Sequence, residues 1–485
     1  MAESRVNSWT DTAEALGADL HLELAGPGSR RAVLTRALRE AVQSGRLAPG
    51  TRLPPYRSLA ADLRVARNTV ADAYAELVAE GWLTARQGSG TRVAERAAPP
   101  APPPRRRPGA AAHPDRPALD LVQGRPDPSA FPRAGWLAAA RRALTAAPHD
   151  AFGPGDPRGR AELRQALAGY LARVRGVRTC PERIVLCSGA AHALRLLADV
   201  VGGRWAVEAY GLPFHRGLLE AGGAATLPLP VDDGGAVVEE LAGHSPAPDA
   251  VLLTPAHQFP TGGPLLPERR TAVVEWARAA GGLVVEDDYD GEFRYDRQPV
   301  GAVQSLDPER VAFLGSVSKS LSPTLRIGWM VLPGHLVDEV VAAKGEREQW
   351  SSATEQLTLA EFVVSGAYDR HVRRMRQRYR RRRDQLTATL AEHAPRMRVS
   401  GIAAGLHAVL ELPPGTERTA LKAAAWQGLA VEGLSGYLHP AAAGLRGRRE
   451  RDGLVVGYAT PPESRYGAAL QALCRVLPSE TPENH

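Results

Sequence analysis

The segment Ala97–Gly109 contains six prolines and three arginines, and it limits what the whole chain can fold into. Proline has no backbone N–H to donate and fixes its own φ angle, so such a segment forms neither a helix nor the interior of a sheet. We expect it to be an extended, semi-rigid and exposed connector. The chain therefore folds as modules before and after it, and we expect boundaries at residues 1–95, 96–118 and 119–480.

The bulk composition is that of an ordinary globular protein, with 44% hydrophobic and 23% charged residues among 485. Its three cysteines fit neither a disulfide framework nor a metal site, and they suit a reducing cytosol. No stretch resembles a signal peptide or reaches the roughly 20 apolar residues of a membrane span. We therefore expect a cytoplasmic protein with no membrane partner. The net charge of +7 permits nucleic-acid binding without demonstrating it.

Between residues 29 and 93 the hydrophobic pattern changes from helical to extended. Ser29 is a typical N-cap for a first helix, and apolar residues at helical spacing predict two more helices, over about 58–63 and 67–81. Two short strands, 82–84 and 91–93, flank a turn at 87–90. Three helices followed by a two-stranded wing are typical of a winged helix-turn-helix, an α+β fold that binds DNA.

Candidate DNA contacts follow from that arrangement. A recognition helix reads base edges with its N-terminal residues, and Arg67, Asn68 and Thr69 occupy that position. Arginine and asparagine pair bidentately with guanine and adenine. Arg57, at the start of the preceding helix, and Gly88, in the wing, would lie along the phosphates. The alternative is a small helical interaction domain with exposed arginines, because arginines and acidic residues are nearly balanced over 1–95.

The order of these motifs closely resembles the GntR family of bacterial transcription regulators. The segments that carry the resemblance are Ser44–Pro54, Leu59–Leu63, Arg67–Val70 and Tyr74–Gly81. The resemblance implies binding to double-stranded operator DNA as a dimer. Arg64 departs from the pattern, since the family often has glycine in this turn.

Residues 119–480 alternate helices with short apolar runs. We predict strands at 184–187, 204–208, 250–253, 283–286 and 311–314, with helices such as 190–200 and 268–280 between some of them. The pattern predicts an α/β fold with a largely parallel sheet, a large part over about 165–345 and a smaller α+β part over about 346–480. Ligands of such sheets bind at the C-terminal ends of the strands, so polar residues there are the candidates for a site.

Lys319 is the most informative of these candidates. The chain holds 60 lysines and arginines, but only Lys319, Lys344 and Lys422 are lysine. Arginine replaces lysine as a surface charge but not as an amine nucleophile, because its guanidinium stays protonated. Lys319 lies among four serines after an apolar run, which suits an imine beside a bound anion. The alternative is a loop lysine hydrogen-bonded to its neighbours.

Other strand ends supply an anion-binding turn, an acid and a phenol. Ser188 and Gly189 open a helix, and a helix N-terminus of this kind binds phosphate. Asp287 and Tyr289 lie at the end of another strand. A carboxylate keeps a pyridine nitrogen protonated, a phenol bonds the ring hydroxyl and a lysine forms the imine, so together these groups predict pyridoxal phosphate. Taken alone, Asp287 and Tyr289 would be an acidic turn with a half-buried ring.

This order resembles the fold-type-I aminotransferases, and with the first module it resembles the MocR subfamily of GntR regulators. The resemblance implies the cofactor pyridoxal 5'-phosphate, held as a Schiff base by Lys319, with Asp287 at the ring nitrogen and Tyr289 at the ring hydroxyl. It implies a set of residues around the phosphate: Ser188, Gly189, Ala190, Ser316, Ser318 and Arg326. It also implies that His257 lies at the cofactor edge, and that two subunits form the site as a homodimer.

Three departures from the aminotransferases bear on activity. Phe259 replaces the asparagine before the Pro-Thr-Gly turn, although MocR-type chains commonly carry an aromatic residue there. Leu212 takes the place of the aromatic residue that stacks on the ring, unless Tyr210 substitutes for it. Val455 lies near the position of the arginine that clamps a substrate α-carboxylate, and Arg216 is a candidate to compensate.

Two arginine-rich segments carry two interpretations each. The cluster Arg105–Arg107 is a solvated tether or a DNA-backbone contact, and the run Arg373–Arg383 is the solvated face of a long helix or a second DNA contact.

The sequence as a whole favours a transcription regulator that senses an amine, an amino acid or pyridoxal phosphate through Lys319. Its aminotransferase-like (transaminase) domain would serve as a sensor without sustained turnover. One alternative is an active aminotransferase that also binds DNA. The other is a regulator whose second domain only dimerises, without a cofactor.

Overall fold

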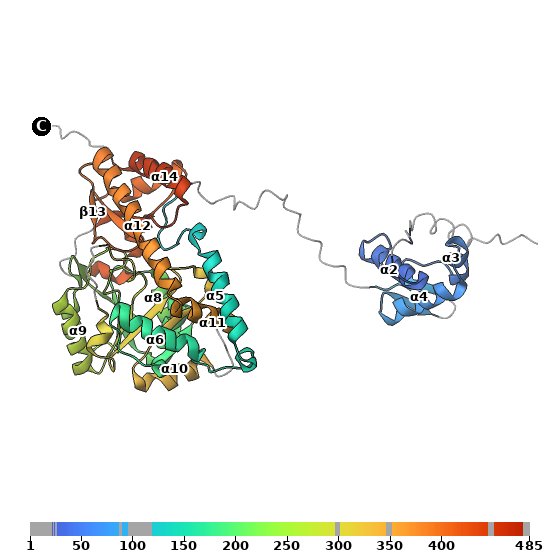
Figure 1. Cartoon of the computed structure of the whole chain (residues 1–485). Helices are drawn as coiled ribbons and strands as arrows, with labels where there is room; N and C mark the ends of the chain where they lie inside the picture. The colour runs from blue at the N-terminus through green and yellow to red at the C-terminus, as the bar shows by residue number, and fades with distance from the viewer. Residues whose placement is uncertain are drawn as a thin grey trace, which may run out of the picture. The chain divides into compact units, whose positions relative to one another are not determined.

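The computed structural model describes residues 22, 24, 27–86, 90–95, 119–295, 301–345, 352–444 and 451–478. The chain forms two compact units, Met1–Pro114 and Asp115–His485 (Figure 1). Each unit has its own hydrophobic core.

The first unit packs three helices with a two-stranded wing. Its elements are α2 (Arg30–Gln43), α3 (Tyr56–Asp62), α4 (Arg67–Ala79), β1 (Leu83–Arg86) and β2 (Gly90–Val93). Ser29 caps α2 as predicted, because its Oγ accepts a hydrogen bond of 3.3 Å from the Ala32 amide. Leu38, Leu59 and Val70 bring the three helices into one core, and β1 and β2 pair antiparallel. The wing tip at 87–89, which includes Gly88, lies outside the described residues.

Arg64 stands in the turn between α3 and α4 with a φ of 53°. This is the left-handed region that favours glycine, because a side chain there crowds the following carbonyl oxygen. The turn thus has a backbone conformation that glycine adopts more readily than arginine. A hydrogen bond from another helix also stabilises this turn, because Arg30 Nη1 on α2 donates to the Arg64 carbonyl at 3.3 Å.

A seven-stranded sheet, with strand order β4-β12-β11-β10-β9-β5-β6, organises the second unit. Its strands are β4 (Ile184–Cys187), β5 (Arg204–Glu208), β6 (Ala225–Leu229), β9 (Ala250–Leu253), β10 (Leu283–Asp287), β11 (Val311–Ser316) and β12 (Gly328–Val331). The pairs from β11 through β10, β9 and β5 to β6 are all parallel. β12, which the sequence analysis did not predict, is antiparallel to both of its neighbours. The predicted fold class, with a mostly parallel sheet, is confirmed.

Helices cover both faces of this sheet. They are α5 (Arg133–Ala146), α6 (Ala161–Arg175), α7 (Ala190–Val201), α8 (Pro213–Ala221), α9 (Pro267–Ala280), α10 (Val337–Lys344) and α11 (Ala353–Val364). Val185 and Ala312 face α7 and α10, whereas Ile184 and Phe313 face α6 and α11. Because both faces are buried, the strands read as continuous apolar runs and not as alternating ones.

The smaller part of this unit is a four-stranded antiparallel sheet with three helices. Its main elements are β13 (Arg398–Ser400), β14 (His407–Leu412), β16 (Glu432–Gly433), β17 (Asp452–Gly457), α12 (Ala367–His393), α13 (Glu417–Trp426) and α14 (Glu463–Val476). Two short pairs complete the described strands: β3 (Leu119–Asp120) with β15 (Leu429–Ala430), and β7 (Val231–Asp232) with β8 (Gly235–Ala236). None of the helices described is long and apolar enough to cross a membrane.

Helix α12 joins the two parts of the second unit (Figure 1). At its N-terminal end, His371 Nε2 lies 2.7 Å from the Ser320 carbonyl and Tyr368 Oη lies 2.7 Å from Ser320 Oγ. Further along, Tyr379 and Leu386 are buried in the core of the smaller part. The helix predicted through the arginine run is present, and several of its arginines are exposed on the face away from these contacts. Its contact with DNA stays a prediction.

Candidate functional site

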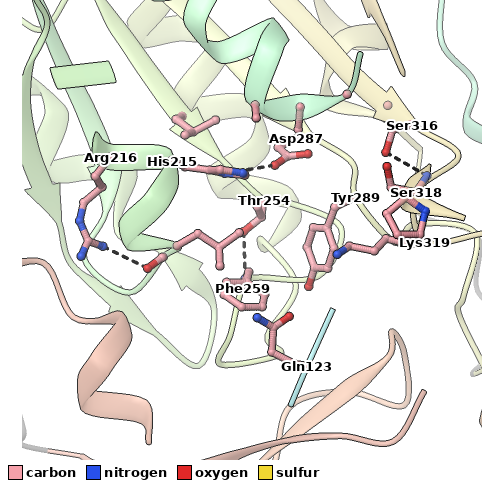
Figure 2. A pocket seen from close by; sticks show the side chains of 18 of the residues that line it. Gln123, His215, Arg216, Thr254, Phe259, Asp287, Tyr289, Ser316, Ser318 and Lys319 are labelled. Carbon is pink, nitrogen blue, oxygen red and sulfur yellow. Dashed lines mark hydrogen bonds and ion pairs between the residues drawn. The ribbon is translucent and has the colours of Figure 1, made fainter. Parts of the chain in front are cut away.

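The C-terminal ends of five strands surround one cavity of about 250 Å³ (Figure 2). All but one of the predicted cofactor-binding residues line it: Ser188, Gly189, Ala190, Asp287, Tyr289, Ser316, Ser318, Lys319 and Arg326. The exception is His257, which contacts Tyr289 instead of the cavity. The structure thus gathers residues from distant segments at one sheet edge, while their individual roles remain predictions.

Lys319 extends into this cavity and points toward Tyr289 (Figure 2). Its Nζ donates to the Gly124 carbonyl at 2.6 Å. Burial lowers the pKa of Lys319 below its ordinary value, while Asp290 and Asp287 act in the opposite direction. A lowered pKa increases the neutral fraction of the amine, which is the form that attacks an aldehyde. The contact with Gly124, 195 residues away in the chain, is one that sequence reasoning missed.

Asp287 is the last residue of β10 and is buried. Burial raises the pKa of Asp287 to about 7, and the neighbouring Asp288 adds to that rise. His215 Nδ1 lies 3.9 Å from the Asp287 carboxylate, and burial lowers the pKa of His215 to about 4. The histidine is therefore neutral near pH 7, and it does not supply the cation that this carboxylate needs. A protonated ring nitrogen placed beside Asp287 would favour its ionised form.

Tyr289 is held from behind by buried polar side chains that sequence reasoning did not identify as a group. Its Oη lies 3.0 Å from His257 Nδ1, which in turn lies 2.9 Å from Asp290 Oδ2. Burial is the largest cause that raises the pKa of Tyr289 well above its ordinary value, so the phenol stays protonated. His407, from the smaller part, packs beside His257 with ring centroids 5.2 Å apart.

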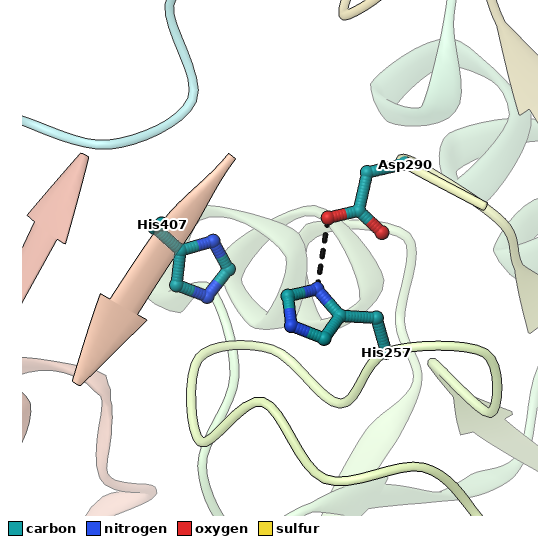
Figure 3. A group of neighbouring side chains, drawn as sticks. All are labelled: His257, Asp290 and His407. Carbon is teal, nitrogen blue, oxygen red and sulfur yellow. Dashed lines mark hydrogen bonds and ion pairs between the residues drawn. The ribbon is translucent and has the colours of Figure 1, made fainter. Parts of the chain in front are cut away.

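His257, Asp290 and His407 also form a group of possible metal ligands (Figure 3). Their candidate ligand atoms lie within 4.8 Å of one another. Hydrogen bonds account for the same arrangement, since His257 bonds Asp290 and His407 Nε2 lies 3.1 Å from the Pro260 carbonyl. His257 and Asp290 thus support Tyr289 through hydrogen bonds, and His407 packs against the His257 ring.

The opposite end of the cavity carries hydroxyl and amide donors. Gly189, with a φ of 113°, turns the chain from β4 into α7, and a side chain on Gly328 would come within 2.7 Å of the Gly189 Cα. Gly328 is therefore needed for the close approach of these backbones, and Gly189 for its left-handed φ angle. The Ser188 amide donates to His192 Nδ1 at 3.2 Å. The Ser188 hydroxyl joins those of Ser316 and Ser318, which belong to the end of β11 and the loop after it (the β11 loop). With Arg326 and the N-terminus of α7, this end suits a phosphate.

Phe259 and Leu212, which line the cavity, pack in an apolar cluster with residues of the smaller part. Val455 is fully buried in a cluster with Tyr210 and Phe259, so the position expected for a carboxylate-binding arginine offers no charge. Arg216 lines the cavity, but its guanidinium donates to three backbone carbonyls at 3.0–3.3 Å. Leu212 also lines the cavity and Tyr210 does not, so the aromatic substitute considered for ring stacking is absent from the lining residues that the structure describes.

In the first unit, Arg67 is the first residue of α4 and is exposed, as is Asn68, while Thr69 is half-buried. Arg57 is exposed on α3. Arg67 and Asn68 are therefore accessible at the N-terminal end of α4, and Arg57 is accessible on α3. Tyr56, which sequence reasoning missed, accepts a hydrogen bond of 3.2 Å from Arg67 Nη2.

Sequence comparisons agree with both units. The profile of the bacterial regulatory proteins, gntR family, matches residues 31–93, and that of aminotransferase class I and II matches residues 120–434. The chain is 33% identical to the HTH-type pyridoxine biosynthesis transcriptional regulator PdxR of Corynebacterium glutamicum, over 90% of this chain and 93% of that protein. It is 35% identical to the probable rhizopine catabolism regulatory protein MocR of Rhizobium meliloti, over 74% of this chain and 77% of that protein.

Solved structures resemble the second unit. Pyrococcus horikoshii kynurenine aminotransferase, solved in complex with PMP, superposes with a TM-score of 0.66 and 25% identity. The match covers 74% of this chain and 90% of that one.

Proposed function

The chain belongs to the MocR subfamily of the GntR transcription regulators, and from this premise we propose that its aminotransferase-like unit is a pyridoxal-phosphate-dependent sensor. The unit would bind the cofactor through Lys319, and an amine, an amino acid or pyridoxal phosphate itself would change operator binding. The observation that carries the proposal is the single cavity lined by Lys319, Asp287, Tyr289 and the hydroxyl-rich β11 loop.

The residues fit the cofactor by their chemistry. When bound, pyridoxal phosphate supplies an aldehyde that captures amines and a ring that withdraws electrons. Lys319 offers an amine whose pKa is lowered by burial, which favours its neutral form. Asp287 offers a buried carboxylate that gains a partner when a ring cation arrives. The donors of Ser188, Ser316 and Ser318 lie at the end where a phosphate would be held.

The apolar cluster beside the cavity favours a sensor over a turnover enzyme. An aminotransferase acting on α-amino acids needs a two-point cationic clamp for the carboxylate, and here Val455 is buried among apolar residues while Arg216 is engaged by backbone carbonyls. Ligands without an α-carboxylate are therefore favoured as effectors. Pyridoxal phosphate is one of them, and the relative PdxR is named for the regulation of pyridoxine biosynthesis.

The first unit would bind double-stranded operator DNA through α4. We propose that the regulator is a homodimer, which suits an operator with two half-sites. Exposed apolar side chains on adjacent helices support this, because Leu137 on α5 is 65% exposed and Val364 at the end of α11 is 72% exposed. Apolar surface of this kind is favourable to bury against a second subunit.

An absorbance spectrum of the purified protein tests the cofactor assignment. The wild type should absorb in the visible range, Lys319→Ala should lose this band, and Lys422→Ala should keep it. Lys422 is the matched control because it is an exposed lysine on α13, outside the cavity. An unchanged spectrum in Lys319→Ala would refute the role of this amine.

Titration with amines, amino acids and pyridoxal phosphate then tests the sensor. The wild type should change both its spectrum and its operator affinity with the same ligand, while Lys319→Ala should bind DNA without that response. Repeated transfer of amino groups to a keto acid would show an aminotransferase instead of a sensor. A colourless wild type that still binds its operator would favour the cofactor-free alternative.

A further inference from the structure

Tyr56 stands beside Arg67 at the end of the recognition helix. The phenol is on the first turn of α3, and Arg67 begins α4 eleven residues later. Arg67 Nη2 donates to Tyr56 Oη at 3.2 Å, and the Arg67 Cζ lies 5.0 Å from the centre of the Tyr56 ring. Two different interactions, one with the hydroxyl and one with the ring face, therefore hold the same guanidinium.

Packing does not explain this tyrosine. Tyr56 is 39% exposed and does not belong to the hydrophobic core of the first unit. Its ring lies instead against the guanidinium of Arg67, and a second arginine is its neighbour in the chain. The second arginine is Arg57, and both arginines lower the pKa of Tyr56, with Arg67 as the larger cause. These contacts associate the ring with the cationic end of α4.

We propose that Tyr56 is a specificity-determining residue that positions Arg67 for reading a guanine in the major groove. The inference rests on the proposed DNA-binding role of the first unit. A free arginine side chain loses much rotamer freedom when it forms a two-point contact with a base. A guanidinium already stacked on a ring and bonded to its hydroxyl loses less of this freedom, so its binding to the correct base is more favourable.

The orientation of the hydroxyl adds a second consequence. Tyr56 Oη accepts from Arg67 and leaves its own O–H available as a donor. The guanidinium has five N–H groups, and one of them is engaged by Tyr56. Enough donors remain for a bidentate contact with guanine O6 and N7. The arrangement therefore orients Arg67 without blocking its binding edge.

Selection of DNA by the full-length protein tests this proposal. The probe is a duplex library randomised over about 20 base pairs, which holds two half-sites one helical turn apart. The variants are Arg67→Ala, Tyr56→Ala, Tyr56→Phe, the double variant with both alanines, and Asp62→Ala as control. Asp62 is an exposed residue at the other end of α3. Thermal unfolding of each variant verifies that the first unit stays folded.

The wild type should enrich a consensus sequence that contains a guanine. In Arg67→Ala, the preference for that guanine over the other bases should fall by about 5- to 150-fold. Tyr56→Ala should relax the preference at that same position, Tyr56→Phe should relax it less because the ring remains, and Asp62→Ala should leave it intact. The double variant should be no less selective than Arg67→Ala, because Tyr56 acts through Arg67.

Two results would overturn the inference, and they differ in what they leave standing. If Tyr56→Ala keeps the full preference at the base that Arg67 reads, Tyr56 has no positioning role, although the DNA-binding proposal survives. If the wild type enriches no sequence at all, the proposed readout by the first unit fails together with the role of Tyr56.

Discussion

Arg175 and Asp288 form a buried ion pair directly after Asp287 in the chain, and its removal has a predictable cost. Arg175, at the end of α6, donates through Nε and Nη2 to the two oxygens of Asp288, both at 2.7 Å. Each side chain is only 4% exposed. Arg175→Met keeps much of the apolar stem but removes the charge, so the carboxylate stays buried without its partner.

The magnitude follows from the desolvation of that carboxylate. Removal of one partner from a buried pair costs about 3–5 kcal/mol, because the remaining charge is neither hydrated nor compensated. Arg173→Met is a matched control on the same helix. Arg173 bonds Asp369 at 2.8 Å but is 57% exposed, and such a surface pair contributes about 0–1 kcal/mol. The two variants differ mainly in burial.

Urea unfolding measured by tryptophan fluorescence distinguishes them. Trp205 and Trp329 are buried in the second unit, so their emission reports its unfolding. We expect a large loss of unfolding free energy for Arg175→Met and a small one for Arg173→Met. Replacing Asp288 by asparagine in the Arg175→Met background should restore part of the loss, because no charge is then left buried. Equal shifts for the two single variants would contradict the reasoning.

Three further outcomes are expected from other features of the chain. Arg64→Gly should stabilise the first unit by about 0.5–1 kcal/mol, because it relieves about 1–2 kcal/mol of left-handed backbone strain, which exceeds the entropy cost of glycine. Thermal unfolding measures this change, and an Arg64→Gly variant less stable than Arg64→Ala would contradict it. Burial raises the pKa of Glu208 to about 7, so the native state binds more protons than the unfolded chain, and the unfolding free energy falls as pH rises from about 4 to 7. Glu208→Gln should make that fall shallower in urea titrations at several pH values, and an unchanged slope would argue against a buried acid. Uptake of pyridoxal phosphate by cofactor-free protein, followed by absorbance, should accelerate with pH with a midpoint below about 10.4, the ordinary pKa of lysine. A midpoint at or above that value would mean that Lys319 is not desolvated.

The parts of the site that the sequence predicted share one physical origin. Ser188, Asp287 and Lys319 each follow an apolar run, and parallel strands bring their C-terminal ends to one edge of the sheet. The periodicity of the apolar residues is a local signal, so these positions could be assigned without a structure. The same holds for Ser29, whose place before the first helix predicted its role as N-cap.

The missed residues depend on contacts between distant segments. Gly124 meets Lys319 across 195 positions, and His407 comes from the smaller part to pack beside His257. No local sequence pattern indicates that such distant residues are neighbours in the fold. Tyr56 is different, because an aromatic residue next to Arg57 in a chain poor in aromatics was a usable signal. The strands β6 and β12 were not among those predicted, because periodicity alone does not distinguish a short apolar strand from a buried helix segment.

Helix α12 has a mechanical consequence for any change in the loop that carries Lys319. Its 27 residues form a rod of about 40 Å that touches Ser320 at one end and is buried in the smaller part at the other. A helix resists compression and bending, so a tilt of about 10° at the Ser320 end would displace the far end by about 7 Å over this length. A small movement of the loop that carries Lys319 would therefore move the far end of α12 by a distance comparable to the length of a side chain.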